Sequence, residues 1–261
     1  MRSFGFVLIR NMFGLALRRL LGLAALLAAL VPAHAAPTIA VGPGTPVAGY
    51  LPLHLFGITA TAGFSDDSIQ NFNVPAFTFA GQSWSSVGIS SNGYLVAGGS
   101  ASETPVNQNL PKTTGPNNIL APFWTDLDFS LGGEILMASL TDGVSSWFVV
   151  EWFQMANKDG TGTNTFQMWI GINGPEDITF EYGAIAAGLG SSGLLTVGAE
   201  DVTGTVGSSY YYNGVGTAPQ VGVSLRVTST DLPVEVPEPA SALLFGLGLA
   251  GLAAARRRMH A

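Results

Sequence analysis

Hydrophobic and polar residues alternate in short runs along most of this chain, and clusters of turn-forming residues separate the runs. Alternation with a period of two is the pattern of β-strands. No long amphipathic helix is predicted. The strongest turn signals are Asn92-Gly93, Asp142-Gly143 and Asn173-Gly174-Pro175, because Asn, Asp and Gly tolerate the backbone angles of tight turns. The strands that we expect are 53–60, 76–80, 83–90, 94–97, 119–124, 134–140, 147–155, 165–172, 178–183, 194–199, 208–212 and 221–227.

Three consecutive predicted strands between residues 147 and 183 allow their two faces to be told apart. In the first of them, one set of alternate side chains contains Glu151 and the other contains Trp152. Burying an unpaired carboxylate is costly, so we expect Trp152, with Phe148 and Val150, to face the core. The opposite face would then gather Trp147, Glu151, Phe153, Gln167, Trp169 and Glu181.

This outer face is too aromatic to be simply solvated, and we weigh two interpretations. The first is that another segment covers it, either the Pro- and Gly-rich stretch before residue 53 or the loop after Leu110. The second is a ligand surface on which Trp147 and Trp169 stack on sugar rings while Glu151 and Glu181 bind hydroxyl groups. A less favoured variant is a glycoside hydrolase that uses the two glutamates.

Many short strands with Gly-rich turns and no helices between them predict an all-β fold. An antiparallel β-sandwich, similar to a jelly roll, is the expected architecture. We place this domain at residues 36–228 and a linker at residues 229–235.

The charge of this domain excludes several classes of partner. Between residues 36 and 235, sixteen acidic residues stand against three basic ones, which leaves a net charge near −13. Such a surface repels nucleic acid and anionic lipid.

Catalysis is poorly supported by the residues that the chain contains. There is no cysteine, so disulfides and thiol chemistry are excluded. His54 is the only histidine between residues 36 and 235, and residues 88–93 lack the Gly-x-Ser-x-Gly pattern of a serine hydrolase. We therefore predict no catalytic residue, no enzymatic activity and no cofactor.

Asp126 and Asp128 are weak candidates for a calcium site. Two residues apart on a strand, their carboxylates would project to one side, and oxygen atoms of the following Gly-rich loop could complete the ligands. The more common role for such residues is hydrogen bonding to nearby loop amides.

The N-terminus has the parts of a secretory signal peptide. Four arginines precede an uncharged apolar run, and Ala33 and Ala35 then form a small-x-small cleavage pattern. We expect residues 1–35 to be removed after Ala35.

The C-terminus has three parts in a fixed order. The motif Val236, Pro237, Glu238, Pro239 comes first, an uncharged run over residues 240–255 follows, and Arg256, Arg257 and Arg258 end it. As a helix the run would be about 24 Å long, somewhat short of a hydrocarbon core of about 30 Å. This order resembles the PEP-CTERM sorting signal of Gram-negative bacteria. The resemblance implies a transient inner-membrane helix, processing by an exosortase-like membrane transpeptidase, and delivery to the cell surface or extracellular matrix.

A second resemblance concerns the predicted domain. Residues 118–128, with Ala121-Pro122-Phe123-Trp124 and the two aspartates, resemble a segment of nidogen-like extracellular domains, as do residues 164–168 and 180–182. Residues 197–212 resemble a segment of secreted bacterial surface proteins. Both resemblances imply an extracellular β module for adhesion or matrix contact, usually without catalysis. We therefore expect a structural or adhesive component associated with exopolysaccharide.

Overall fold

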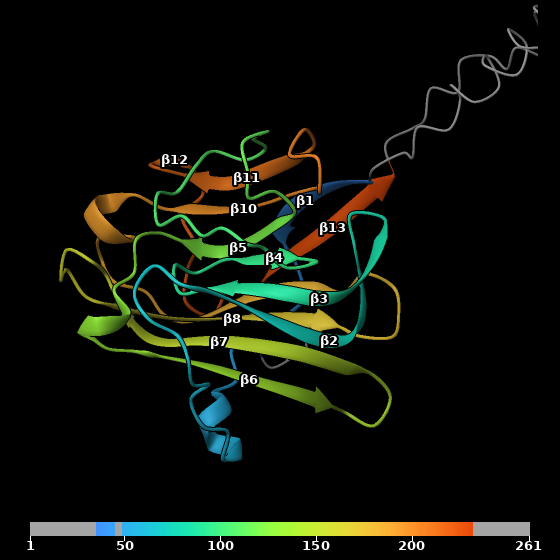
Figure 1. Ribbon diagram of the computed structural model, residues 1–261, viewed down its shortest axis with the longest axis horizontal. Coiled ribbons are helices and arrows are strands. Elements are labelled where there is room, and N and C mark those ends of the chain that lie inside the picture. Colours follow the sequence, from blue (N-terminus) through green and yellow to red (C-terminus); the bar gives the residue numbers. More distant parts are fainter. Residues whose placement is uncertain (1–34, 45–48, 232–261) are drawn as a thin grey trace, which may run out of the picture. The chain divides into compact units, whose positions relative to one another are not determined.

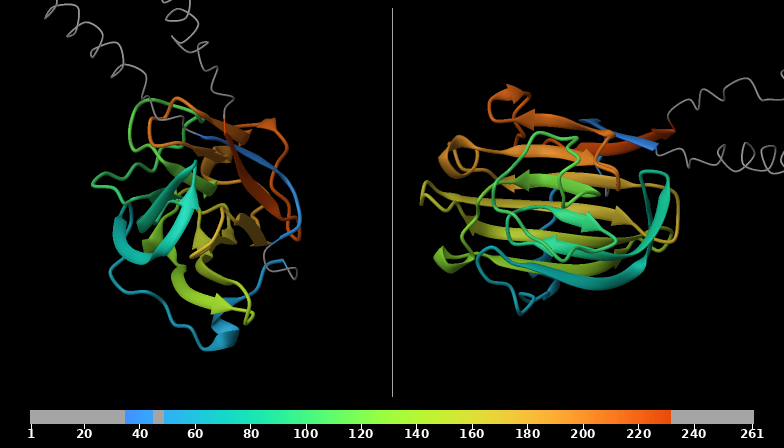
Figure 2. Two further views of the ribbon diagram at one scale, coloured as in Figure 1. Left: turned by 90° about the vertical axis from the view of Figure 1, so that its right-hand side faces the viewer. Right: turned by 45° about the horizontal axis from the view of Figure 1, so that its top comes forward.

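The alternating runs form two antiparallel β-sheets that pack face to face (Figures 1 and 2). The computed structural model describes residues 35–44 and 49–231. The six-stranded sheet has the order β1 (Ala35–Val41), β13 (Leu225–Asp231), β9 (Ile178–Ala184), β8 (Thr163–Gly171), β7 (Ser146–Ala156) and β6 (Glu134–Thr141).

The second sheet has seven strands, and three short 3-10 helices lie in the connections. These helices are η1 (Leu53–Phe56), η2 (Phe129–Leu131) and η3 (Ser191–Gly193). The strand order of the seven-stranded sheet is β12 (Val215–Gly216), β11 (Gly207–Tyr212), β10 (Thr196–Glu200), β5 (Ile119–Trp124), β4 (Leu95–Ala97), β3 (Gln82–Ser90) and β2 (Ile69–Phe79). The all-β antiparallel sandwich predicted from the sequence is confirmed.

The main core lies between the sheets and is rich in aromatic side chains. Trp152 and Phe166 stack with ring centroids 5.2 Å apart. Two hydrogen bonds cross this core from sheet to sheet: Trp152 Nε1 donates to the carbonyl of Ser90 at 2.9 Å, and the Tyr182 hydroxyl donates to the carbonyl of Pro122 at 2.9 Å. The polar atoms of these large side chains are therefore satisfied where they are buried.

The Asn92-Gly93 turn joins β3 to β4, as predicted. Gly93 has φ +77°, and a β-carbon there would lie 2.0 Å from the carbonyl oxygen of Phe123. Only glycine fits this position, for both reasons. The amide of Ser90 donates to the carbonyl of Tyr94 at 2.9 Å and closes the turn.

Most predicted strands are present; the main exceptions lie before residue 76, and smaller ones are the unpredicted β12 and the later start of β13, at Leu225. Residues 53–60 were predicted as a strand, but Leu53–Phe56 form η1, which ends at Gly57 with φ 72°. Strand β1 was not predicted, and neither was the first half of β2. The expected linker is also partly wrong, because β13 continues through Asp231.

Several predictions concern segments outside the described residues. These are the body of the signal peptide with Ala33, the sorting motif Val236–Pro239, the run 240–255 and the arginines 256–258. Within residues 35–44 and 49–231, no helix is long and apolar enough to cross a membrane.

Candidate functional site

The outer face of the six-stranded sheet carries the row of polar side chains that the alternation predicted. Trp152 faces the core, and its neighbour Glu151 faces outward. Gln167 on β8 lies opposite Glu151 on β7, and Glu181 on β9 lies opposite Gln167. The three side chains therefore form one line across three strands.

The covering segment, which we define as residues 49–58, lies over this row. Its buried anchor is Leu53, which has no exposed surface and packs in one cluster with Trp147, Val149 and Trp169. The interpretation that another segment covers the aromatic face is confirmed: Tyr50 and Leu51 belong to the expected stretch before residue 53, whereas the anchor Leu53 lies just after it. The loop that contains Leu110 covers the other sheet instead, where it packs with Tyr94, Val96, Ile119, Ala121 and Trp124.

The polar row binds the covering segment through hydrogen bonds. Glu151 accepts from the Tyr50 hydroxyl at 2.5 Å and from the amide of Leu53 at 2.9 Å. Gln167 bonds both the amide and the carbonyl of Leu51, at 3.2 and 2.6 Å. Since Glu151 has no exposed surface, these bonds replace the water that it loses on folding.

Glu181 is buried beside the same segment. It is 1% exposed, and it accepts from the Ser224 hydroxyl at 2.7 Å. Burial raises the pKa of Glu151 and of Glu181 above their ordinary values. Both carboxyl groups are thus parts of the packed structure and lie away from solvent.

These contacts bear directly on the sugar-platform and glycosidase hypotheses. Trp147 is 6% exposed and Trp169 is 1% exposed. The two rings pack edge to face, 6.2 Å apart, and the Trp147 indole donates to Asp177 at 2.8 Å. Neither ring face is open to a sugar, and neither Glu151 nor Glu181 can reach a glycosidic bond, because the covering segment occupies the space that a ligand would need.

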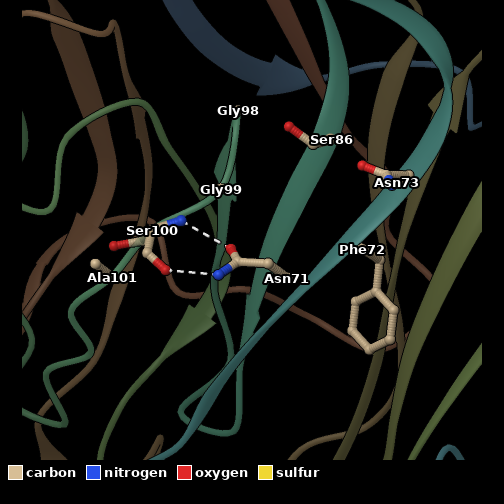
Figure 3. A pocket seen from close by; sticks show the side chains of 8 residues that line it. All are labelled: Asn71, Phe72, Asn73, Ser86, Gly98, Gly99, Ser100 and Ala101. Atoms are coloured by element: carbon tan, nitrogen blue, oxygen red, sulfur yellow. Dashed lines mark hydrogen bonds between the residues drawn. The ribbon is translucent and has the colours of Figure 1, made fainter.

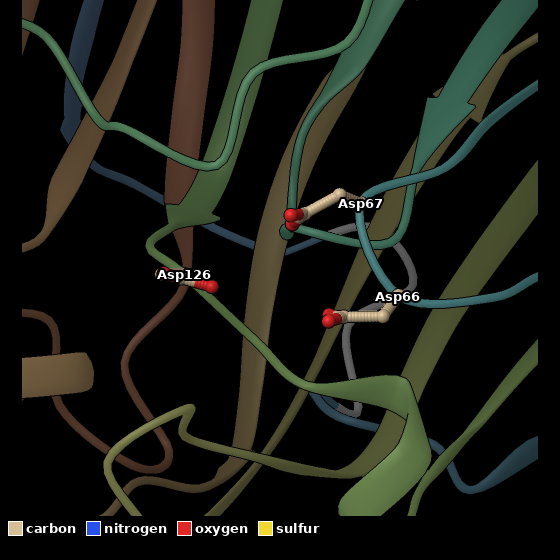
Figure 4. Close-up of side chains that lie close together, drawn as sticks. All are labelled: Asp66, Asp67 and Asp126. Atoms are coloured by element: carbon tan, nitrogen blue, oxygen red, sulfur yellow. The ribbon is translucent and has the colours of Figure 1, made fainter.

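A second group of acidic side chains lies in the loops at one end of the sandwich. Asp66 and Asp67 precede β2 and Asp126 follows β5, and carboxylate oxygens of the three lie within 4.8 Å of one another (Figure 4). Asp66 and Asp67 were not among the predicted site residues, because the strand that they precede was expected to begin at residue 76 and begins at Ile69. An acidic pair immediately before a strand was the available signal.

The prediction that Asp126 and Asp128 share a site requires correction. Asp128 accepts from the amide of Ser130 at 2.8 Å as the N-cap of η2, and it lies 2.8 Å from Lys158 Nζ. The hydrogen bond from Lys158 lowers the pKa of Asp128 to about 2. The chain has left β5 before these residues, so the two-residue spacing no longer directs both carboxylates to one side.

Lys158 also neutralises part of the Asp66, Asp67 and Asp126 cluster. Its ammonium group lies 2.5 Å from Asp66 Oδ2. Burial raises the pKa of Asp126, and the charge of Asp67 adds to this effect. Acidic loop clusters with a lysine beside them are common on protein surfaces, so we assign no metal to this one.

The two ends of the described domain lie side by side. β1 pairs with β13, and Ala35 lies opposite Asp231 (Figure 1). The antiparallel register from β13 through β9 and β8 to β7 places Ala156 at the opposite end of the sandwich. We call the first end the tail end and the second the loop end. The amide of Asp128 donates to the carbonyl of Ala156 at 2.9 Å, so the acidic loops belong to the loop end.

Comparison with known protein families identifies both parts of the chain. Residues 48–245 match the family described as NIDO related. The chain belongs to the NIDO-related family. Residues 235–258 match the PEP-CTERM protein-sorting motif. No match is found among curated proteins or among solved structures.

These matches confirm the two resemblances seen in the sequence. The NIDO-related match spans nearly the whole sandwich and is that of an extracellular β domain. The sorting motif is that of an exported protein recognised by exosortase, a membrane protein, and processed at the cell envelope. Neither family is catalytic.

Proposed function

We propose that this NIDO-related protein is a non-catalytic adhesive or structural component of the exopolysaccharide matrix at the cell surface. The observation that carries the proposal is the pairing of β1 with β13. It brings both ends of the domain to the tail end, where the sorting segment continues from Asp231. The loop end lies at the opposite end of the sandwich, and we expect it to make contact while the protein is held at the envelope.

The buried positions of Glu151 and Glu181 support a role without catalysis. Glu151 and Glu181, the only pair that the sequence offered for glycoside hydrolysis, hold the covering segment and its neighbours in place. A domain whose two candidate catalytic carboxylates are committed to internal contacts is suited to binding and to load bearing. The net charge near −13 over residues 36–235 keeps neighbouring copies soluble and apart.

The proposal is tested by asking where the processed protein resides. Matrix is sedimented from cultures, and half of each sample is digested with enzymes that degrade the exopolysaccharide. We expect the protein in the sediment before digestion and in the supernatant after it. Protein that stays in the supernatant of undigested samples would contradict the proposal, as would new reducing ends released by the protein itself.

A further inference from the structure

A hollow of about 510 Å³ lies on the seven-stranded sheet, the sheet opposite the one that the covering segment packs on (Figure 3). It is formed by the edge strand β2, by β3, and by the turn that follows β4. We call it the β2 groove. Its polar side chains are those of Asn71, Asn73, Ser86 and Ser100, and Gly98 and Gly99 belong to the turn after β4.

The β2 groove is held in shape by bonds between its own walls. Asn71 donates from Nδ2 to the carbonyl of Ser100 at 2.8 Å and accepts at Oδ1 from the amide of Ser100 at 2.9 Å. Gly99 has φ +89°, and a β-carbon there would lie 2.8 Å from Asn71 Oδ1. The groove is therefore pre-formed. Gly98 and Gly99 carry no side chain, so their main-chain atoms line the groove directly.

Two side chains in the groove have unused hydrogen-bonding capacity. Asn73 and Ser86 lie opposite each other on β2 and β3, and neither side chain forms a hydrogen bond within the described residues. An amide and a hydroxyl group together supply donors and acceptors without charge. Because β2 is the edge strand of its sheet, main-chain groups of its first half are also free of a second strand.

The lining has no ionisable side chain, although the domain carries a net charge near −13. A polyanion approaching this surface would be repelled. An apolar ligand would leave the amide and hydroxyl groups without partners, which is costly. A neutral ligand rich in hydroxyl groups meets both conditions, and the volume is within the usual range of about 300–1,000 Å³ for ligand sites.

We propose that the β2 groove binds a neutral glycan chain, with Asn73 and Ser86 as its hydrogen-bonding groups. This inference rests on the proposed matrix function and names the ligand class and the site. The groove lies in the sheet that does not contain β13, the strand from which the sorting segment continues. Contact through a few hydrogen bonds is weak, and many copies on one surface would multiply it.

The test uses exopolysaccharide from the same cells, separated by anion exchange into a neutral and an acidic fraction. Processed protein is run in native gels that contain either fraction, and its retardation is compared with a gel without glycan. Ser86→Trp fills the groove. Ser85→Trp adds the same bulk at an exposed neighbour that does not line the groove. Asn73→Ala removes one hydrogen-bonding group with little change in packing.

We expect retardation of the wild type by the neutral fraction only. Ser86→Trp should lose it, Ser85→Trp should keep it, and Asn73→Ala should bind roughly fivefold more weakly, the loss typical of one hydrogen bond. Equal retardation of Ser86→Trp and wild type, or retardation by the acidic fraction alone, would overturn the groove assignment and leave the matrix function standing. Absence of retardation by both fractions would overturn both. A dimer seen without glycan and lost in Ser86→Trp would instead make the groove a contact between copies.

Discussion

At the scale of single residues, buried carboxyl groups dominate the electrostatics of this domain. Glu200, at the end of β10, has no exposed surface, and its Oε2 accepts from the amide of Lys112 at 2.7 Å. Its Oε1 has no hydrogen-bond partner within the described residues. Burial raises its pKa from 4.5 to about 7. Burial also raises the pKa of five further carboxyl groups: Glu103, Asp126, Glu151, Glu176 and Glu181.

This shift predicts a pH dependence of stability with a definite sign. The folded protein keeps the Glu200 proton up to about pH 7, while the unfolded chain releases it near 4.5. Folding stability therefore falls as pH rises through that window and is constant above it. Glu200→Gln keeps a side-chain oxygen that can accept from the Lys112 amide, and it removes the titratable carboxyl group. We expect its Tm to exceed that of the wild type by a few degrees at pH 8 and to match it at pH 4.

Thermal melts of both proteins between pH 4 and pH 8 provide the measurement. A Glu200→Gln protein whose Tm does not exceed that of the wild type at pH 8 would contradict the assignment. The other buried carboxyl groups are common to both proteins, so the difference between the two curves isolates Glu200.

The facing of Glu151 was predictable from the sequence, but its environment was not. Alternation along one strand is a local property and set Glu151 outward correctly. Its main partner, Tyr50, lies 101 positions away, and no local pattern links the two. Coverage of this face by another segment was expected, but the partners that the segment brings to Glu151, the Tyr50 hydroxyl and the Leu53 amide, were not. The structure shows that an outward face can itself be a buried layer when another segment covers it.

At the scale of elements, the covering segment carries the clearest prediction about packing. Leu53 is fully buried against Trp147 and Trp169, whereas Leu55, two positions later, is 71% exposed. Leu53→Ala should lower the free energy of unfolding by about 2–5 kcal/mol, because it leaves a cavity under the segment. The matched control Leu55→Ala should change it by less than about 0.5 kcal/mol. Equal losses in denaturant melts of the two variants would show that the segment is not anchored in this way.

The same element shows where sequence patterns mislead. Leu53 and Leu55 alternate with His54 and Phe56, which is the pattern of a strand, yet the residues form η1 and end at Gly57 in the left-handed region. Strand β1 shows the converse case. It is short and contains Pro37, and it is a strand because β13 pairs with it from about 190 positions later. Pairing with distant partners decides the structure of such segments, and local propensity does not.

At the scale of the whole molecule, fold class followed from the sequence, while the division of strands between two sheets did not. The many turns and the absence of amphipathic helices were enough to predict a sandwich. The grouping of β1 with β13, and hence the common tail end, depends on long-range pairing. The sorting motif, by contrast, was readable in full because it is a linear signal over residues 235–258.

The central claim is that the C-terminal segment delivers this NIDO-related domain to the outside of the cell. The most direct measurement is mass spectrometry of the C-terminus after cell fractionation, in cells with and without exosortase. We predict a chain that ends near Pro239 at the cell surface or in the matrix of normal cells. Cells without exosortase should retain Arg256–Arg258 on protein in the inner membrane. An uncut tail in both strains would contradict the account and would leave the protein as a membrane-attached periplasmic domain.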